Sequence, residues 1–380
     1  MHPAKATAAA VTTLIGIGAA TVAAARYAGD AALRTSPGRP LPGDPWVTVH
    51  SASPGQVTLT RDLATLRPGT YGLEGTGPGG GAVHAVVGPV LDAVPHEADT
   101  VVRRLERISH GSLEPGAKVW LTPQVHTGDP RGALGIAYEN VEVTGELGAL
   151  PAWYVPGTRT TWVIAVHGLG GTREHPLNVL ELLHRYRLPV LGLGYRGDPG
   201  APRSPDGLGH LGDSEWRDLD AAIRHAVRHG AERIVLYGWS TGATMALHVA
   251  TSSALRHLVR GIVLDSPVLD REATVRALAV ARRTPAALLP LAVRAVQGAT
   301  GPYGDPLRDA AAPNGLRVPA LIVHGPDDTV APWGPSRALA AARPDLVTLH
   351  TVPDAPHAAM WNADPAAYEE VLRRFLTPLM

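Results

Sequence analysis

From residue 161 onward, short apolar runs alternate with helical stretches, and this alternation constrains the fold more than any other feature. The runs are apolar at successive positions, so strands formed from them would be apolar on both faces. Such strands separated by helices are typical of a mainly parallel sheet with helices on both faces. We expect an antiparallel pair at residues 138–144 and 152–155, further strands at 161–166, 189–193, 233–237, 261–264, 320–323 and 346–352, and helices at 213–229, 241–252 and from Asp364 to the C-terminal residues.

One strand-to-helix junction has the sequence of a nucleophile turn. Residues 234–247 read IVLYGWSTGATMAL, with Ser240 between Gly238 and Gly242. Glycines two residues on either side of the serine let the strand and the helix approach each other closely. A lone Gly-x-Ser-x-Gly motif arises often by chance, so its meaning depends on the other loops at the same edge of the sheet.

A glycine-rich loop, His167-Gly168-Leu169-Gly170-Gly171, follows the predicted strand at residues 161–166. Attack of a serine on an acyl carbon places negative charge on the carbonyl oxygen, which N–H groups fixed in advance can stabilise. We expect the backbone N–H groups of Leu169 and Thr241 to be these donors.

Two later loops supply an acid and a base. The loop HGPDDTVAP contains Asp328, which would orient an imidazole, and His357 would take the serine proton. The order Ser240, Asp328, His357 is the chain order expected of this kind of site. Asp327 and Asp265 also lie near strand ends, but we expect both to cap turns.

These motifs together resemble the α/β-hydrolase superfamily over residues 134–380, on HGLGG, GYRGDPG, GWSTG, HGPDDTVAP and the late histidine. The layout is similar to serine esterases, lipases and prolyl-oligopeptidase-like hydrolases. The resemblance implies a Ser-His-Asp triad, hydrolysis through an acyl-enzyme, and a mobile lid at residues 271–317. Pro356 departs from the family pattern, which has Gly before the catalytic histidine.

The preceding region, residues 46–133, lies outside the resemblance. Turn signals such as Gly77-Pro78-Gly79-Gly80-Gly81 separate short β-like runs in it, which predicts a small β-rich region. We expect strands at residues 46–50, 56–60 and 118–122, one helix at 99–108, and a Pro- and Gly-rich linker at residues 30–45 before the region.

The N-terminal segment, residues 1–29, is hydrophobic. From Ala6 to Ala25 no residue is charged, with Lys5 before and Arg26 after, so the length suits a membrane-spanning helix. A secretory signal peptide is the alternative, since alanines at residues 23–25 fit a cleavage site, and an Ala-rich soluble helix is the third reading. We therefore expect a chain that is anchored to a membrane by this segment or secreted.

Composition narrows the class of function. The formal net charge is zero and no long basic run is present, which argues against nucleic acid as a partner. The chain has no Cys, so disulfides and thiolate nucleophiles are excluded, and its 17 His show no metal-ligand spacing. No cofactor or metal is implied. We expect a serine hydrolase acting on an ester or thioester, with a small acyl substrate or short peptide as its partner. A serine peptidase and a non-catalytic binding protein on the same scaffold are the alternatives.

Overall fold

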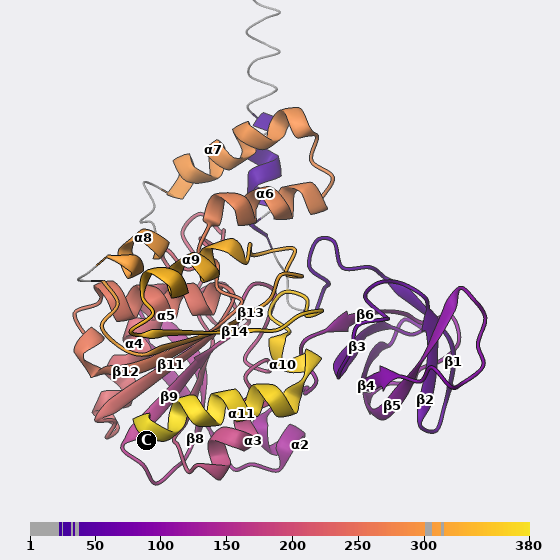
Figure 1. The fold of residues 1–380 in the computed structure, drawn as a ribbon, viewed down its shortest axis with the longest axis horizontal. Coiled ribbons are helices and arrows are strands. Elements are labelled where there is room, and N and C mark those ends of the chain that lie inside the picture. Colours follow the sequence, from indigo (N-terminus) through magenta and orange to yellow (C-terminus); the bar gives the residue numbers. More distant parts are fainter. Residues whose placement is uncertain (1–22, 25, 32, 35–37, 301–305, 313–314) are drawn as a thin grey trace, which may run out of the picture.

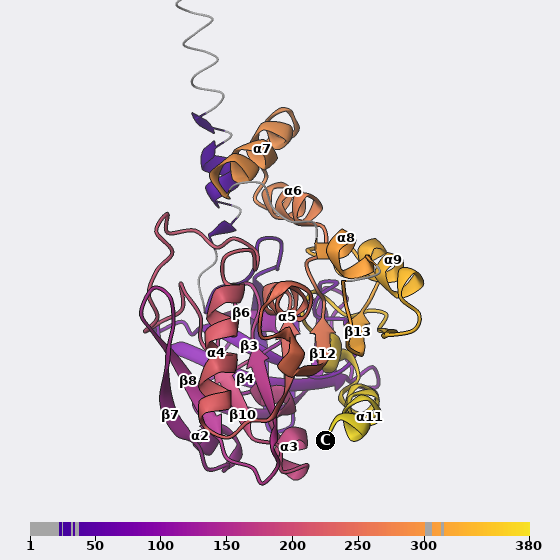
Figure 2. The same ribbon diagram turned by 90° about the vertical axis from the view of Figure 1, so that its left-hand side faces the viewer.

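The protein consists of a β-barrel beside a larger α/β domain, with a helical hairpin projecting from the latter (Figure 1; Figure 2). The computed structural model describes residues 23–24, 26–31, 33–34, 38–300, 306–312 and 315–380. Most of the predicted N-terminal membrane or signal segment, residues 1–22 and 25, lies outside these residues, and it stays a prediction. Within the described ranges, no helix is both long and apolar enough to span a membrane.

An eight-stranded sheet forms the centre of the α/β domain, in the order β14-β13-β12-β11-β9-β10-β8-β7. The two strands at one edge are antiparallel to their neighbours and the other pairs are parallel. This confirms the mainly parallel sheet and the antiparallel pair that the sequence predicts. The strands are β7 (Glu139–Thr144), β8 (Ala149–Val155), β9 (Thr161–Val166), β10 (Val190–Leu193), β11 (Arg233–Trp239), β12 (Val259–Asp265), β13 (Ala320–His324) and β14 (Val347–Thr351).

Helices cover both faces of this sheet because its central strands are apolar on both sides. On one face pack α4 (Trp216–Arg228), α5 (Thr241–Ser252), α8 (Pro306–Ala311) and α9 (Gly334–Ala342). On the other face pack α3 (Leu177–Arg185), α10 (Met360–Ala363) and α11 (Pro365–Leu376), together with the short α2 (Pro130–Leu134). Asp364 caps α11 as predicted, since its side chain accepts from the Ala367 N–H.

The β-rich region is a closed six-stranded barrel with its own apolar core. Its order is β1-β2-β5-β4-β3-β6, with bounds β1 (Val47–Ser53), β2 (Gln56–Thr60), β3 (Tyr71–Thr76), β4 (Ala82–Val90), β5 (Thr100–His110) and β6 (Lys118–Thr122). The helix predicted at residues 99–108 is wrong, because this segment is strand β5. Its apolar residues are spaced as on a helix face, but they pair with both β2 and β4. The buried Arg103 side chain fixes the neighbouring loop by donating to carbonyls of Thr65, Arg67, Gly69 and Gly88.

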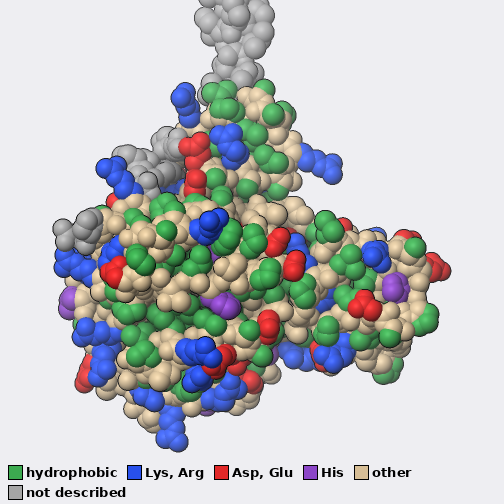
Figure 3. All heavy atoms as spheres, in the orientation of Figure 1, with side chains coloured by type: hydrophobic (Ala, Val, Ile, Leu, Met, Phe, Trp, Pro, Cys, Tyr) green, Lys and Arg blue, Asp and Glu red, His purple; other side chains and the backbone are tan. Residues whose placement is uncertain are grey.

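The barrel is bonded directly to the α/β domain. Asn362 Nδ2 lies 2.8 Å from the Thr70 carbonyl and 2.9 Å from the Pro123 carbonyl, and the Thr70 N–H donates back to the Asn362 carbonyl at 2.8 Å. Ala359, from the loop before α10, is buried in the apolar core of the barrel. The space-filling view shows the barrel as a lobe continuous with the larger domain (Figure 3).

The predicted lid, residues 271–317, divides into two parts. Helices α6 (Arg271–Ala281) and α7 (Leu289–Thr300), joined by the turn η2 (Ala286–Leu288), form the projecting hairpin, whereas α8 packs into the main core. Leu33, from the predicted linker, is buried beside the hairpin residues Val275 and Val293. Residues 301–305 and 313–314 lie outside the described residues, and mobility of the hairpin stays a prediction.

Candidate active site

Ser240 lies on a sharp turn between β11 and α5. Its φ is +51° and ψ is −115°, a conformation that L-residues rarely adopt. A Cβ on Gly238 would lie 2.3 Å from backbone atoms of Gly242, and one on Gly242 would lie 2.2 Å from the Val166 carbonyl oxygen. Only glycine fits at both positions, so the two glycines of the motif are required by the close approach of strand and helix.

A hydrogen-bonded chain links Ser240 to His357 and Asp328. Ser240 Oγ lies 2.6 Å from His357 Nε2, and His357 Nδ1 lies 2.7 Å from Asp328 Oδ2. A carboxylate can only accept, so Nδ1 carries the proton and Nε2 accepts from the Ser240 hydroxyl. The three side chains are buried and come from the loops after β11, β13 and β14.

Asp328 is held in its ionised form. Its Oδ1 accepts from the Val330 and Ala331 N–H groups at 2.9 and 2.8 Å, and its Oδ2 also faces His324 Nε2 at 3.1 Å. Burial would raise the pKa of Asp328, but the charge of His357 and the bonds from the two imidazoles outweigh it, so the pKa lies below its usual range.

The pKa of His357 is shifted in the opposite direction. Burial would lower the pKa of its imidazole, but the neighbouring Asp328 carboxylate, by charge and by hydrogen bond, raises it above 6.5. Asp265 and Asp44 add to the same direction. This base is neutral only above that raised pKa, and an ionised Asp328 stabilises the imidazolium that proton transfer produces.

The other two candidate carboxylates have different partners. Asp327 Oδ2 accepts from the Asp354 N–H at 2.8 Å, so it bonds the loop before His357 and not the turn of its own loop that we expected it to cap. Asp265 ends β12 and accepts from the hydroxyls of Ser266 at 2.8 Å and Tyr368 at 3.0 Å. Of the three, Asp328 is the one that bonds His357, which meets the distance expected for the predicted orienting carboxylate.

The predicted oxyanion donors lie at the same place. A Cβ on Gly168 would be 2.5 Å from Ser240 Cβ, so the glycine-rich turn that carries Leu169 packs directly on the serine. Thr241 begins α5, where the first N–H groups of a helix lack intrahelical acceptors. Both residues line a pocket next to Ser240. Their role as oxyanion donors stays a prediction.

Several residues of the site carry no strong sequence signal. His167 Nε2 is bonded to Asp198 Oδ2 at 2.7 Å, which anchors the glycine-rich turn. Ser266 Oγ accepts from the Ala358 N–H at 3.0 Å and holds the loop that carries His357. His324 stands in the HGPDD motif, but its spacing to Asp328 alone does not show that the two are bonded. The sequence offers one indication of this bond: His324 and His357 both lie at the ends of strands that neighbour the Asp328 loop.

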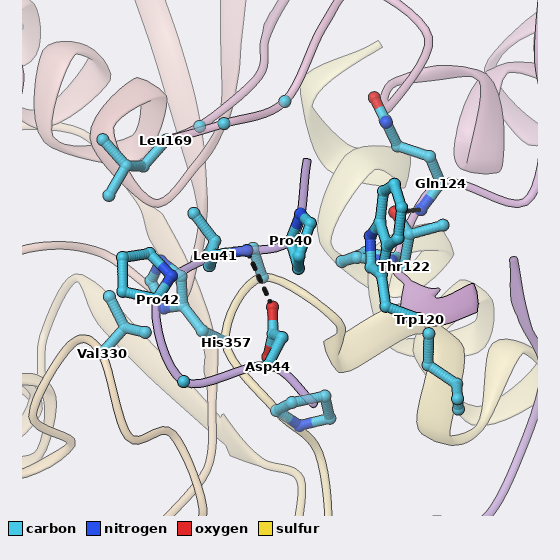
Figure 4. Close-up of a pocket in the computed structure, with 18 of the residues that line it drawn as sticks. Pro40, Leu41, Pro42, Asp44, Trp120, Thr122, Gln124, Leu169, Val330 and His357 are labelled. Carbon is cyan, nitrogen blue, oxygen red and sulfur yellow. Dashed lines mark hydrogen bonds between the residues drawn. The ribbon is translucent and has the colours of Figure 1, made fainter. Parts of the chain in front are cut away.

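The pocket beside His357 has walls from distant parts of the chain (Figure 4). Leu169 and Val330 come from the α/β domain, Trp120 comes from the barrel, and Leu41 and Pro42 come from the predicted linker. Residues 39–44 of the predicted linker are therefore not a free connection, because they form part of the pocket wall. Among the described residues, no group of three or more His, Asp or Glu is placed to hold a metal ion.

Two family models match the chain. One, described as the alpha/beta hydrolase fold, matches residues 211–361, which include Ser240, Asp328 and His357. The other is a domain of unknown function that matches residues 48–122, the extent of the barrel.

Individual proteins are also similar to this chain, and one solved structure agrees with the first family in fold. An esterase of Pyrococcus furiosus, Pf2001, superposes with a TM-score of 0.55, at 22% identity over 66% of this chain and 94% of that chain. The uncharacterised protein YfhR of Escherichia coli strain K12 is 24% identical over 58% of this chain and 73% of its own length. YfhR of Salmonella typhimurium is 24% identical over 63% of this chain and 81% of its own length. The C-terminal domain thus has the α/β-hydrolase fold, which confirms the resemblance to that superfamily seen in the motifs.

Proposed function

We propose that the protein is a serine hydrolase that cleaves an ester or thioester bond through an acyl-enzyme. The observation that carries the proposal is the continuous chain from Ser240 Oγ through His357 to Asp328, with bonds of 2.6 and 2.7 Å. The similarity in fold to an esterase supports an ester as the substrate.

In the first half-reaction, Ser240 Oγ bonds to the acyl carbon while its proton passes to His357 Nε2. The carbonyl oxygen takes the negative charge, facing the N–H groups of Leu169 and Thr241. The bond from the acyl carbon to the leaving oxygen or sulfur then breaks, and His357 gives the proton to that atom. In the second half-reaction, water attacks the acyl carbon, gives its proton to His357, and Ser240 leaves with that proton.

A fluorophosphonate probe tests the nucleophile. We expect one covalent adduct per chain at Ser240, located by peptide mass spectrometry, and none in Ser240→Ala. That variant should fold normally, because the turn depends on Gly238 and Gly242, and its turnover should fall by about four orders of magnitude or more. Unmodified Ser240 together with undiminished ester hydrolysis by Ser240→Ala would refute the proposal.

A substrate panel separates the alternatives. Methyl esters, methyl thioesters and peptide methylamides should be compared at equal concentration, and we expect turnover of the esters or thioesters. Turnover of the amides alone would identify a peptidase instead. A chain that neither reacts with the probe nor turns over any of these compounds would be a binding protein on a hydrolase scaffold.

A further inference from the structure

Residues 39–44, within the predicted linker, form a fixed turn in the active-site pocket. The Asp44 N–H donates to the Leu41 carbonyl at 3.0 Å, and the Leu41 N–H donates to Asp44 Oδ2 at 3.1 Å. The Leu41 side chain packs against an apolar cluster that includes Leu278 of α6 and Val330 of the Asp328 loop. The turn is therefore held by both the hairpin and the catalytic domain.

This turn leaves little space beside His357. Leu41 and Pro42 lie next to His357, and Trp120 of the barrel stands across the pocket (Figure 4). The remaining cavity is about 80 Å³. A dry cavity of roughly 150 Å³ accommodates benzene, so this one suits a group of about three carbon atoms or fewer.

A larger pocket, of about 310 Å³, lies against the same glycine-rich turn. It is lined by Thr241, the helix-terminal oxyanion candidate, and by polar residues that include His167 and Ser204. His357 lines the smaller pocket and Thr241 lines the larger one. An ester bound with its acyl carbon at Ser240 therefore has two pockets of different size for its acyl group and its leaving group.

The chemistry decides which half enters which pocket. His357 must give its proton to the leaving oxygen, so the leaving group has to lie on the side of His357. We propose that residues 39–44 are a specificity element that restricts the leaving group to a short alcohol, while the acyl half occupies the larger pocket. This inference rests on the proposed serine-hydrolase function. Leu41 contributes the side chain that sets the limit.

Two series of simple esters test it in the full-length protein by pH-stat titration. In the alcohol series, methyl, ethyl, butyl and hexyl butanoate, kcat/KM of the unmodified protein should fall at least tenfold from methyl to hexyl. Leu41→Ala should raise the ratio of kcat/KM on hexyl butanoate to that on methyl butanoate about tenfold, since each methylene accommodated is worth roughly tenfold or more. Leu41→Trp should lower kcat/KM most for the butyl and hexyl esters.

The acyl series, methyl esters from acetate to octanoate, is the internal control, and neither Leu41 variant should alter its profile. Leu63→Ala is the matched control variant, because Leu63 is 84% exposed on the barrel. An unchanged alcohol profile in both Leu41 variants, or a change in the acyl series instead, would overturn the inference and leave the proposed function standing. Failure of the unmodified protein to hydrolyse any ester in either series would overturn both.

Discussion

Asp265 ends β12, and Asp328 lies in the loop after the neighbouring parallel strand β13. Both side chains are buried, yet their pKa values differ strongly. Two imidazoles and two backbone N–H groups surround Asp328, and its pKa is lowered. Burial raises the pKa of Asp265 to about 7, and the Ser266 and Tyr368 hydroxyls offset this only in part.

The difference teaches that burial at a strand end does not by itself make a catalytic carboxylate. Hydroxyl partners are neutral and satisfy Asp265 without supplying positive charge, whereas His357 can become a cation beside Asp328. Asp265 instead stabilises the loop that carries the base, because Ser266 bonds both Asp265 and the Ala358 N–H. The two carboxylates should therefore respond differently to loss of charge.

Loss of charge at Asp328 should have the largest effect. Asp328→Asn keeps the shape but favours the wrong tautomer of His357, so kcat should fall by about three to four orders of magnitude. Steady-state kinetics with methyl butanoate measures this, and circular dichroism checks the fold. Asp327→Asn is the matched control and should stay within a few-fold of the unmodified protein. Equal losses of kcat in the two variants would show that Asp328 is not the orienting carboxylate.

The pH dependence of kcat/KM should report the charge that Asp328 places on His357. Because the pKa of His357 is raised above 6.5, activity should rise with pH through a midpoint above that value. Below the midpoint the rate should fall about tenfold per pH unit, as the base becomes protonated. In Asp328→Asn, residual activity should have a lower midpoint, since burial then dominates. A midpoint unchanged by that substitution would contradict the assignment.

Removing the second imidazole from Asp328 should have an intermediate effect. His324→Leu deletes one donor to Oδ2 and leaves the Ser336 hydroxyl, 2.8 Å from His324 Nδ1, without its acceptor. The carboxylate becomes more basic, so the pH midpoint should move upward and kcat should fall by roughly tenfold. His324→Gln offers an N–H at a similar place and should restore the midpoint. An unmoved midpoint in His324→Leu would show that His324 only fills space.

Loss of charge at Asp265 should affect activity least, within a few-fold at pH 8. The substitution should instead change the free energy of unfolding, because the pKa of Asp265 is about 7 in the folded state and 3.8 in the unfolded state. The folded state then binds the extra proton between pH 4 and 7, so stability falls as pH rises through that window. Asp265→Asn removes this loss, on the order of a few kcal/mol. Urea unfolding at pH 4.5 and 7.5 measures it, and a constant difference between the two proteins would contradict the raised pKa.

The catalytic domain was predictable because its signals are local. Predicted strand 161–166 and predicted helix 241–252 have the observed bounds of β9 and α5, since apolar runs and the Gly-x-Ser-x-Gly turn lie within single segments. The pairing of His357 with Asp328 was expected from the chain order of the motifs and from the resemblance to the superfamily. The strand and the helix need no knowledge of distant parts of the chain.

The remaining features depend on contacts between distant residues. The sequence of β5 fits a helix until its pairing with β2 and β4 is known. Leu41 lies in a Pro- and Gly-rich stretch typical of linkers, and only the tertiary fold brings it beside His357. The second bond of Asp328, to His324, is likewise set by how the loop after β13 closes on the strand.

Ala359 lies two residues after His357 in the chain, and its burial in the barrel core ties the packing of the barrel to the His357 loop. Opening the barrel core would release the segment that positions the base, so an intact barrel is a condition for an intact site. Amide hydrogens of β3 and β6 should then exchange with the same opening free energy as those of the His357 loop. The barrel could not be exchanged for another module, as a tethered domain could, without rebuilding the loop that carries the catalytic histidine.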